Sequence, residues 1–320
     1  MTTAVLGIDT SCYTTSAAIV SLEGEILASS RRLLTVEEGE RGLQQSQGLF
    51  QHIKNLPQMI ENAAAQAGDV HIAAVCASTR PRPAEEAYMP VFKAGESQAR
   101  AAAALLCVPF YPVSHQEGHV RAAMVDAGVN ENQPLLALHL SGGTTEILLS
   151  DKGNLTLLGG SLDLHAGQLI DRMGVRMQMS FPAGPSLEKL AMQGKAQGLI
   201  GVSIKGVNCC LSGAENKAVK WLESGEMPRE QIAAEVFDFI CRTVYRQIEA
   251  ASEETGARQA LLAGGVASST HLRGMLEARA KKRGLKCRLH FARPELSGDN
   301  AVGVALLGVG WLKQESKNKE

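Results

Sequence analysis

Two histidines, His115 and His119, stand four residues apart in the segment 114–119, which reads Ser-His-Gln-Glu-Gly-His. Ser114 and Glu117 match an S-x-x-E capping box, so we expect a helix to begin at this segment. Residues i and i+4 share one face of a helix, which lets both imidazoles reach a common point. Two converging neutral imidazoles suit a borderline divalent metal such as zinc or iron. The alternative interpretation is a pair of solvated histidines on a helix surface.

The same spacing argues against a zinc peptidase. Enzymes of the H-E-x-x-H type place the general-base glutamate directly after the first histidine. Gln116 occupies that position here, and Glu117 follows one residue later, about 100° further round the helix. The segment therefore favours metal binding without peptidase chemistry.

Composition bounds the class of protein. The chain has 320 residues, of which 45% are hydrophobic and 20% charged, as in an ordinary globular protein. Its seven cysteines, an odd number in a long chain, fit a reducing compartment better than a disulfide framework. The sequence shows no signal peptide and no apolar run of membrane-spanning length. We expect a cytoplasmic protein that does not enter the membrane.

The charge balance gives little support to nucleic-acid binding by this chain alone. The formal net charge is −1, whereas such proteins usually carry a basic footprint. Short basic clusters occur at residues 31–32, 80–82 and 281–288, and each is typical of a solvated face. If a polynucleotide is the substrate, we expect a partner chain to contribute to binding.

Strand-like and helix-like segments alternate along the chain, which indicates an α/β protein. We expect strands at residues 4–9, 16–21, 25–31, 71–77, 109–113, 135–140, 145–150, 154–159, 259–262 and 287–291. We expect helices at residues 49–66, 94–106, 164–173, 186–193, 215–222, 229–255 and 300–311, with further helices from 115 and 269 and a loose tail at 315–320.

One pattern occurs twice. Residues 4–31 and 135–159 both read as strand, polar turn, strand, glycine turn, strand, about 130 residues apart. Solenoid repeats have periods of 20–50 residues, so a repeat at this distance indicates two similar lobes. We expect a first lobe of residues 1–130 and 298–320, a second lobe of residues 131–297, and a ligand cleft between them.

Three glycine-rich turns, at residues 141–145, 182–185 and 264–266, are predicted to follow strands. Small residues in such turns let backbone N–H groups approach an anionic ligand. Each turn alone is also compatible with a plain tight turn, and neither a Walker A sequence nor GxGxxG is present. With the two meanders, they indicate a two-lobed actin/sugar-kinase/Hsp70-like (ASKHA) fold that binds a nucleotide between duplicated lobes.

The chain resembles the TsaD family, also called Gcp, YgjD or Kae-like, over nearly its whole length. Members transfer a threonylcarbamoyl group from threonylcarbamoyl-adenylate to N6 of adenosine 37 in tRNAs that read ANN codons. The matching motifs are GIDTS at residues 7–11, HxEGH at 115–119, LxLSGGTT at 138–145, DxxAGQxxD at 163–171, PAGP at 182–185, AGGVAS at 263–268 and ARPExxxDN at 292–300.

The resemblance implies roles for particular residues. His115, His119 and Asp299 match the family's ligands for one divalent metal, with iron or zinc as the expected ion. The residues expected to bind the adenylate substrate or an ATP-like nucleotide are Leu140, Ser141, Gly142, Gly143, Thr144, Asp171, Gly184, Gly264, Gly265 and Ser269.

The chain also departs from the family pattern. Tyr13 and Thr14 replace an acidic pair, so the catalytic proton acceptor stays unknown. Thr144 replaces a histidine, residues 80–83 replace a GPG loop, residues 43–46 replace a VPE motif, and Ser269 stands where the family has asparagine. This pattern indicates a divergent paralogue. Two alternatives therefore stay open: carbamoyl-type transfer to another acceptor, and a catalytically weak partner or regulatory subunit.

The resemblance also implies protein partners, a TsaB-like paralogue and a TsaE-like ATPase. In the predicted helix 49–66, one apolar stripe consists of Leu49, Ile53, Leu56 and Ile60. A stripe of this width usually faces the core. The neighbouring helix 94–106 is rich in alanine, which lets another helix approach closely. We predict a homo- or heterodimer through these two helices.

Overall fold

The computed structural model describes residues 1–11, 13–36, 43–84 and 86–318. Cys12, which precedes Tyr13 and Thr14 in the sequence, lies outside these residues, as do the last two residues of the predicted tail. The chain divides into two compact units. Unit 1 consists of Met1–Val125 and the chain from Gly298 onward, and unit 2 consists of Asp126–Ser297.

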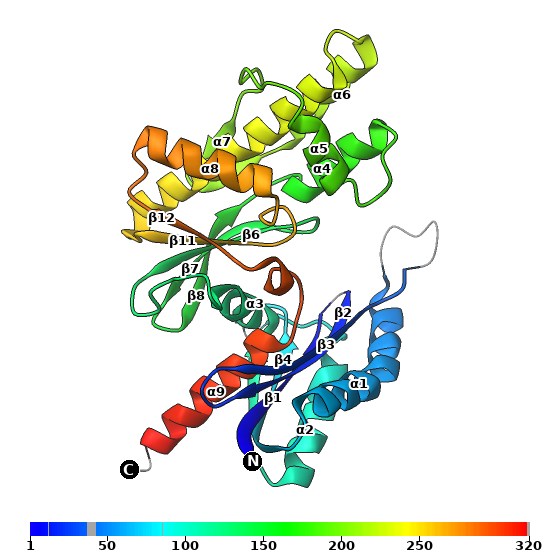
Figure 1. Cartoon of the computed structure of the whole chain (residues 1–320), viewed down its shortest axis with the longest axis vertical. Helices are drawn as coiled ribbons and strands as arrows, with labels where there is room; N and C mark the ends of the chain where they lie inside the picture. Colours follow the sequence, from blue (N-terminus) through cyan, green and yellow to red (C-terminus); the bar gives the residue numbers. More distant parts are fainter. Residues whose placement is uncertain (12, 37–42, 85, 319–320) are drawn as a thin grey trace. The chain divides into compact units, whose positions relative to one another are not determined.

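Unit 1 is built on a five-stranded sheet of order β3-β2-β1-β4-β5 (Figure 1). The first three strands form an antiparallel meander, and β4 and β5 add to β1 in parallel. The strands are β1 (Thr2–Thr10), β2 (Thr14–Ser21), β3 (Ile26–Leu33), β4 (Val70–Arg80) and β5 (Phe110–Ser114).

Helices cover both faces of this sheet. The core on one face joins β1 to α1 (Gln45–Ala67) and α2 (Phe92–Leu106), with Ile8, Leu56 and Met59 among its buried members. On the other face lies α9 (Val302–Lys317), which packs on β1 and on α3 (His115–Met124). The covering on both sides explains why β1 and β2 are almost entirely buried.

Unit 2 repeats the plan with the order β12-β11-β6-β7-β8. Its meander β6-β7-β8 is antiparallel, and β11 and β12 extend it in parallel beside β6. The two sheets therefore share strand order and strand direction, and the predicted two-lobed α/β fold is confirmed. The strands are β6 (Leu135–Leu140), β7 (Thr145–Asp151), β8 (Asn154–Gly160), β11 (Gln259–Ala263) and β12 (Arg288–Phe291).

The helices of unit 2 surround its longest one, α7, which is buried along much of its length. These helices are α4 (Ala166–Arg176), α5 (Gly184–Ala191), α6 (Ser212–Ser224), α7 (Arg229–Thr255) and α8 (Thr270–Arg283). None of the described helices is long and apolar enough to cross a membrane.

The structure corrects several expectations. The Pro182–Pro185 turn follows α4 and not a strand, and Gly184 is the first residue of α5. Helix α9 continues to Lys317, so the predicted tail is helical over residues 315–317. A short hairpin, β9 (Ser203–Lys205) with β10 (Asn208–Cys210), was not predicted.

Helix α1 buries most of the predicted apolar stripe: Leu56 is fully buried, and Leu49 and Ile60 pack against the core. Its buried positions are Gly48, His52, Leu56, Met59 and Ala63, whereas the side chain of Ile53 is 50% exposed. The fold can bury His52 because both of its ring nitrogens have hydrogen-bond partners. One nitrogen lies 2.8 Å from the hydroxyl of Thr15, and the other lies 2.8 Å from the carbonyl oxygen of Ser11.

Candidate metal and nucleotide sites

The histidine segment begins a helix as predicted. The hydroxyl of Ser114 accepts a hydrogen bond from the backbone N–H of Glu117 at 3.2 Å. The carboxylate of Glu117 accepts one from the backbone N–H of Ser114 at 2.7 Å. This reciprocal capping box fixes the first turn of α3, and therefore the direction in which His115 leaves the backbone.

A close helix crossing places α3 against α9. A β-carbon added to Gly303 would overlap the carbonyl oxygen of Gly118, and one added to Gly118 would lie 2.7 Å from Val304 Cγ2. Glycine at both positions lets the two backbones touch. The segment that precedes α9, which carries Asp299, therefore reaches the first turn of α3.

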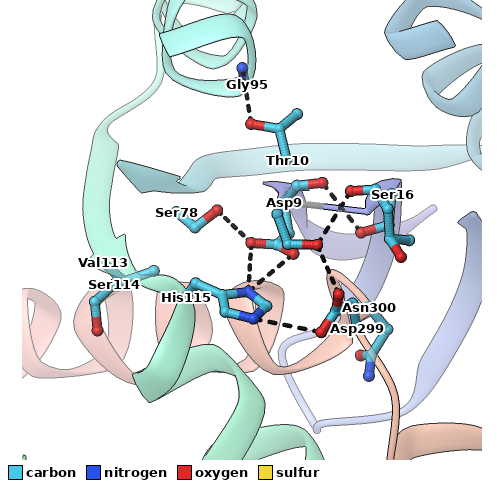
Figure 2. A network of polar contacts seen from close by, with 12 residues as sticks. Asp9, Thr10, Ser16, Ser78, Gly95, Val113, Ser114, His115, Asp299 and Asn300 are labelled. Atoms are coloured by element: carbon cyan, nitrogen blue, oxygen red, sulfur yellow. Dashed lines mark hydrogen bonds and ion pairs between the residues drawn. The ribbon is translucent and has the colours of Figure 1, made fainter. Parts of the chain in front are cut away.

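Asp299 lies beside His115 in this arrangement (Figure 2). Its Oδ1 is 3.4 Å from Nε2 of His115, and its Oδ2 accepts a hydrogen bond from the hydroxyl of Ser11 at 2.8 Å. The ring of His119 follows one turn later, with its centroid 5.7 Å from that of His115. The structure thus brings all three predicted metal ligands into one region of unit 1.

A second carboxylate touches the opposite side of the His115 ring. Both carboxylate oxygens of Asp9 lie 3.1 Å from Nδ1 of His115, and the hydroxyl of Ser78 also donates to Asp9 (Figure 2). Sequence reasoning missed Asp9, Ser78 and Ser11 as parts of this site. Asp9 and Ser11 stand in the GIDTS motif, which was the one available signal.

The electrostatics follow from this arrangement. Burial alone would lower the pKa of His115, but the negative charges of Asp9 and Asp299 outweigh it and hold that pKa well above its ordinary value. Burial, aided by the charge of His115, lowers the pKa of His119. Burial would raise the pKa of Asp299, yet the hydrogen bond and charge of His115 hold it well below the ordinary range.

Two of the three predicted ligand atoms lie at a distance that fits a shared divalent metal. Two ligand atoms each about 2.1 Å from a tetrahedral zinc ion lie about 3.4 Å apart, which matches the spacing of His115 Nε2 and Asp299 Oδ1. Within the described parts of the chain, no three or more His, Cys, Asp or Glu side chains form a group that could hold a metal ion. Convergence of His119 with the other two on one ion therefore stays a prediction.

In unit 2, the predicted nucleotide residues gather where two neighbouring parallel strands end. Leu140 ends β6, and the turn after β11 returns to it through a hydrogen bond from the N–H of Val266 to the carbonyl oxygen of Leu140, at 3.0 Å. Gly264 has φ +102°, and a β-carbon there would overlap the carbonyl oxygen of Leu140. The fold therefore requires glycine at position 264.

Other glycines of the two turns have no such structural reason. A β-carbon on Gly142, Gly143 or Gly265 would meet nothing within 4 Å, and none of the three adopts a left-handed φ. Their missing side chains leave the backbone open at the strand ends. An open backbone of this kind lets N–H groups approach an anionic ligand, as the sequence analysis predicts for Ser141–Thr144.

The remaining predicted residues lie on neighbouring helices. Gly167, at the start of α4, packs against Gly142, and Asp171 stands one turn further along α4. Asp171 accepts a hydrogen bond from the N–H of Ala183 at 2.8 Å, which fixes the turn before Gly184. Ser269 caps α8, its hydroxyl accepting from the N–H of Leu272 at 3.0 Å. Asp171 and Ser269 thus stabilise the local structure of unit 2.

Comparison with solved structures defines the class of fold. HypF of T. kodakarensis superposes with a TM-score of 0.64 at 13% identity, over 98% of this chain and 48% of that one. A ROK glucokinase from Streptomyces griseus superposes with a TM-score of 0.54 at 11% identity, over 95% of this chain and 98% of that one. At these identities the likeness shows the fold alone, and that fold is the ASKHA architecture.

The sequence comparisons define the family. A model of the family described as "TsaD: tRNA N6-adenosine threonylcarbamoyltransferase" matches residues 49–306. A Thermus thermophilus protein named tRNA N6-adenosine threonylcarbamoyltransferase is 32% identical over 97% of this chain and 93% of its own length. A protein of the same name from Neorickettsia sennetsu is 30% identical over 97% of this chain and 94% of its own length. The chain belongs to the TsaD family.

Another relative carries an additional region. The "Probable bifunctional tRNA threonylcarbamoyladenosine biosynthesis protein" of Methanothermobacter thermautotrophicus is 28% identical over 95% of this chain, but only 55% of its own length is covered. That protein therefore contains a segment of comparable length that this chain does not match.

Proposed function

We propose that the chain transfers a threonylcarbamoyl group from threonylcarbamoyl-adenylate to N6 of adenosine 37 in tRNA. Similarity over nearly the whole length to proteins named for this activity carries the proposal. In the reaction, the N6 amine forms a bond to the carbamoyl carbon. The bond from that carbon to the phosphate oxygen breaks, AMP leaves, and N6 loses one proton.

In this proposal the residues of unit 2 bind the leaving group. Backbone N–H groups of the loop Ser141–Thr144 would hold the phosphate, because the open glycines give its oxygens room to approach. Negative charge grows on that phosphate as AMP leaves, so donors fixed at the strand ends stabilise the transition state more than the bound substrate.

In unit 1, His115, His119 and Asp299 would hold one divalent metal, with zinc or iron as the proposed ion. The metal, when bound, supplies a Lewis acid for the substrate's carbonyl and carboxylate oxygens. The two imidazoles and one carboxylate supply three ligands and leave coordination positions open for those oxygens.

Restoration of the modified nucleoside in cells tests the proposed function. The gene would be placed in a strain from which every related gene has been removed, and bulk tRNA nucleosides would be analysed by mass spectrometry. We expect threonylcarbamoyladenosine to return. Its absence, in the presence of stable protein and of the host's partner proteins, would contradict the proposal.

A second candidate function is that of a catalytically weak partner of another family member. The observation that favours it is the replacement of the family's acidic pair: Tyr13 is 48% exposed, and Thr14 is buried. Turnover of an unmodified tRNA transcript by the purified chain, alone and with partner chains, separates the two functions. Turnover by the isolated chain would exclude the weak-partner function.

We also propose that α1 and α2 form a dimer interface with a TsaB-like paralogue or with a second copy, and that a TsaE-like ATPase assists. Phe50 and Ile53 on α1 are 62% and 50% exposed, and Leu105 at the end of α2 is 86% exposed. Light scattering would test the interface: Phe50→Asp should give monomers, and a wild-type monomer under all conditions would exclude the dimer.

A further inference from the structure

We propose that Asp9 is a positioning residue that fixes the ring of His115, so that Nε2 of this ring faces Asp299 and a divalent metal. The inference rests on the metal dependence of the proposed function. It concerns residues of unit 1 alone, and metal binding can test it without any measurement of tRNA modification.

The Asp9 carboxylate is buried against the ring of His115. Asp9 is fully buried, and both of its oxygens lie 3.1 Å from Nδ1 of His115. Ser78 donates its hydroxyl proton to the same carboxylate. A buried carboxylate needs donors of this kind, because an unpaired buried charge strongly destabilises a fold.

Hydrogen bonds fix the strand end that carries Asp9. The hydroxyl of Thr10 donates to the carbonyl oxygen of Val91 at 3.0 Å and accepts from the N–H of Gly95 at 3.3 Å. Asp9 also pairs with Ser16 in the antiparallel ladder of β1 and β2, whose backbone contacts do not depend on the Ser16 side chain. The neighbouring hydrogen bonds thus hold the backbone at Asp9 in place (Figure 2).

The two ring nitrogens of His115 face different carboxylates. An ionised carboxylate only accepts hydrogen bonds, so the contact with Asp9 places a proton on Nδ1. In the neutral ring, the lone pair is then on Nε2, the atom 3.4 Å from Asp299 Oδ1. A carboxylate behind a metal-binding histidine fixes its tautomer and orientation and strengthens it as a ligand.

A purely structural ion pair is the competing explanation, and the variants are chosen to separate the two. Asp9→Asn keeps the shape of the side chain and removes its charge. Ser78→Ala removes one hydrogen bond to the carboxylate and leaves the charge. Ser16→Ala is the matched control, because Ser16 contacts the backbone of Asp9 and not its carboxylate.

The primary measurement is affinity for Co²⁺ and Zn²⁺ by chelator competition, with the Co²⁺ absorption spectrum as a signature of the ligand set. We expect Asp9→Asn to weaken binding by about 10- to 100-fold, Ser78→Ala to weaken it by a smaller factor, and Ser16→Ala to leave it unchanged.

Equal metal affinity in Asp9→Asn and Ser16→Ala would overturn the inference. If Asp9→Asn does not fold, Ser78→Ala decides by the same criteria. A wild-type protein that binds neither ion also overturns it. Normal metal binding without tRNA modification would contradict the proposed function and leave the role of Asp9 intact.

Discussion

Gly118 of α3 and Gly303 of α9 meet backbone to backbone, with no side chain of either residue between the two helices. The contact joins two segments separated by most of the chain. It sets the distance between the helix that carries His115 and His119 and the segment that carries Asp299.

Gly303→Ala should destabilise the protein by about 2 kcal/mol or more, because the added methyl group overlaps the backbone of α3. Gly310→Ala on the same helix is the control, since its β-carbon meets nothing within 4 Å. That variant should be stabilised by about 0.5–1 kcal/mol. Urea unfolding measures both, and similar stabilities for the two variants would contradict the close crossing.

Gly143→Ala should leave the free energy of unfolding within about 0.5 kcal/mol of the wild type, because its β-carbon enters open space. It should nevertheless weaken binding of an adenine nucleotide by about tenfold or more, since the methyl group blocks access to the loop. Gly264→Ala should instead destabilise the fold. Calorimetric titration with AMP measures the affinity, and unchanged affinity in Gly143→Ala would remove the loop from the binding site.

His115→Ala and His119→Ala should each lose bound zinc or iron and still unfold cooperatively. Each substitution removes one of three proposed ligands, and the remaining two hold the ion weakly. The exposed His71, in strand β4, provides the control His71→Ala, which should keep its metal. Elemental analysis of purified protein measures the content, and equal metal in all three variants would exclude the site.

Asp163 should make stability depend on acid pH. Burial would raise the pKa of Asp163, but hydrogen bonds from the Ser212 hydroxyl and from the N–H groups of Leu211 and Leu164 lower it to about 2. The folded pKa lies below the ordinary 3.8, so the ionised form stabilises the fold above that pH. The stabilisation disappears as the pH falls from about 4 towards 2.

Asp163→Asn should accordingly be less stable than the wild type at neutral pH, with a difference that shrinks on acidification. Asp69→Asn, at an exposed carboxylate, serves as the control. Thermal unfolding between pH 7 and pH 2.5 measures the trend. A difference in stability between Asp163→Asn and the wild type that stays constant across this range would show that the charge of the carboxylate does not stabilise the fold.

The sequence predicted those parts of the fold that depend on residues close together in the chain. The capping box at Ser114 and Glu117 involves residues three apart, and the two meanders repeat one pattern of strands and turns. Helix α7 was predicted with the bounds that the structure gives it, Arg229–Thr255. The hairpin β9–β10 escaped prediction because its strands have three residues each, too few to show an alternation.

The misjudged parts depend on contacts between distant residues. Asp9 and His115 are 106 positions apart, and Ser11 and Asp299 are 288 apart, so no spacing rule connects them. On α1, a search for apolar periodicity favours Ile53 over His52. The structure buries His52 instead, because Thr15 and Ser11 satisfy both of its ring nitrogens.

Transfer in a purified system tests the central claim most directly. The protein would be combined with threonylcarbamoyl-adenylate, a divalent metal, TsaB-like and TsaE-like proteins, and unmodified tRNA transcripts carrying adenosine or guanosine at position 37. We expect threonylcarbamoyladenosine only in the adenosine transcript, and its loss in Asp299→Ala. No modified nucleoside, under conditions in which another TsaD family member produces it, would contradict the account.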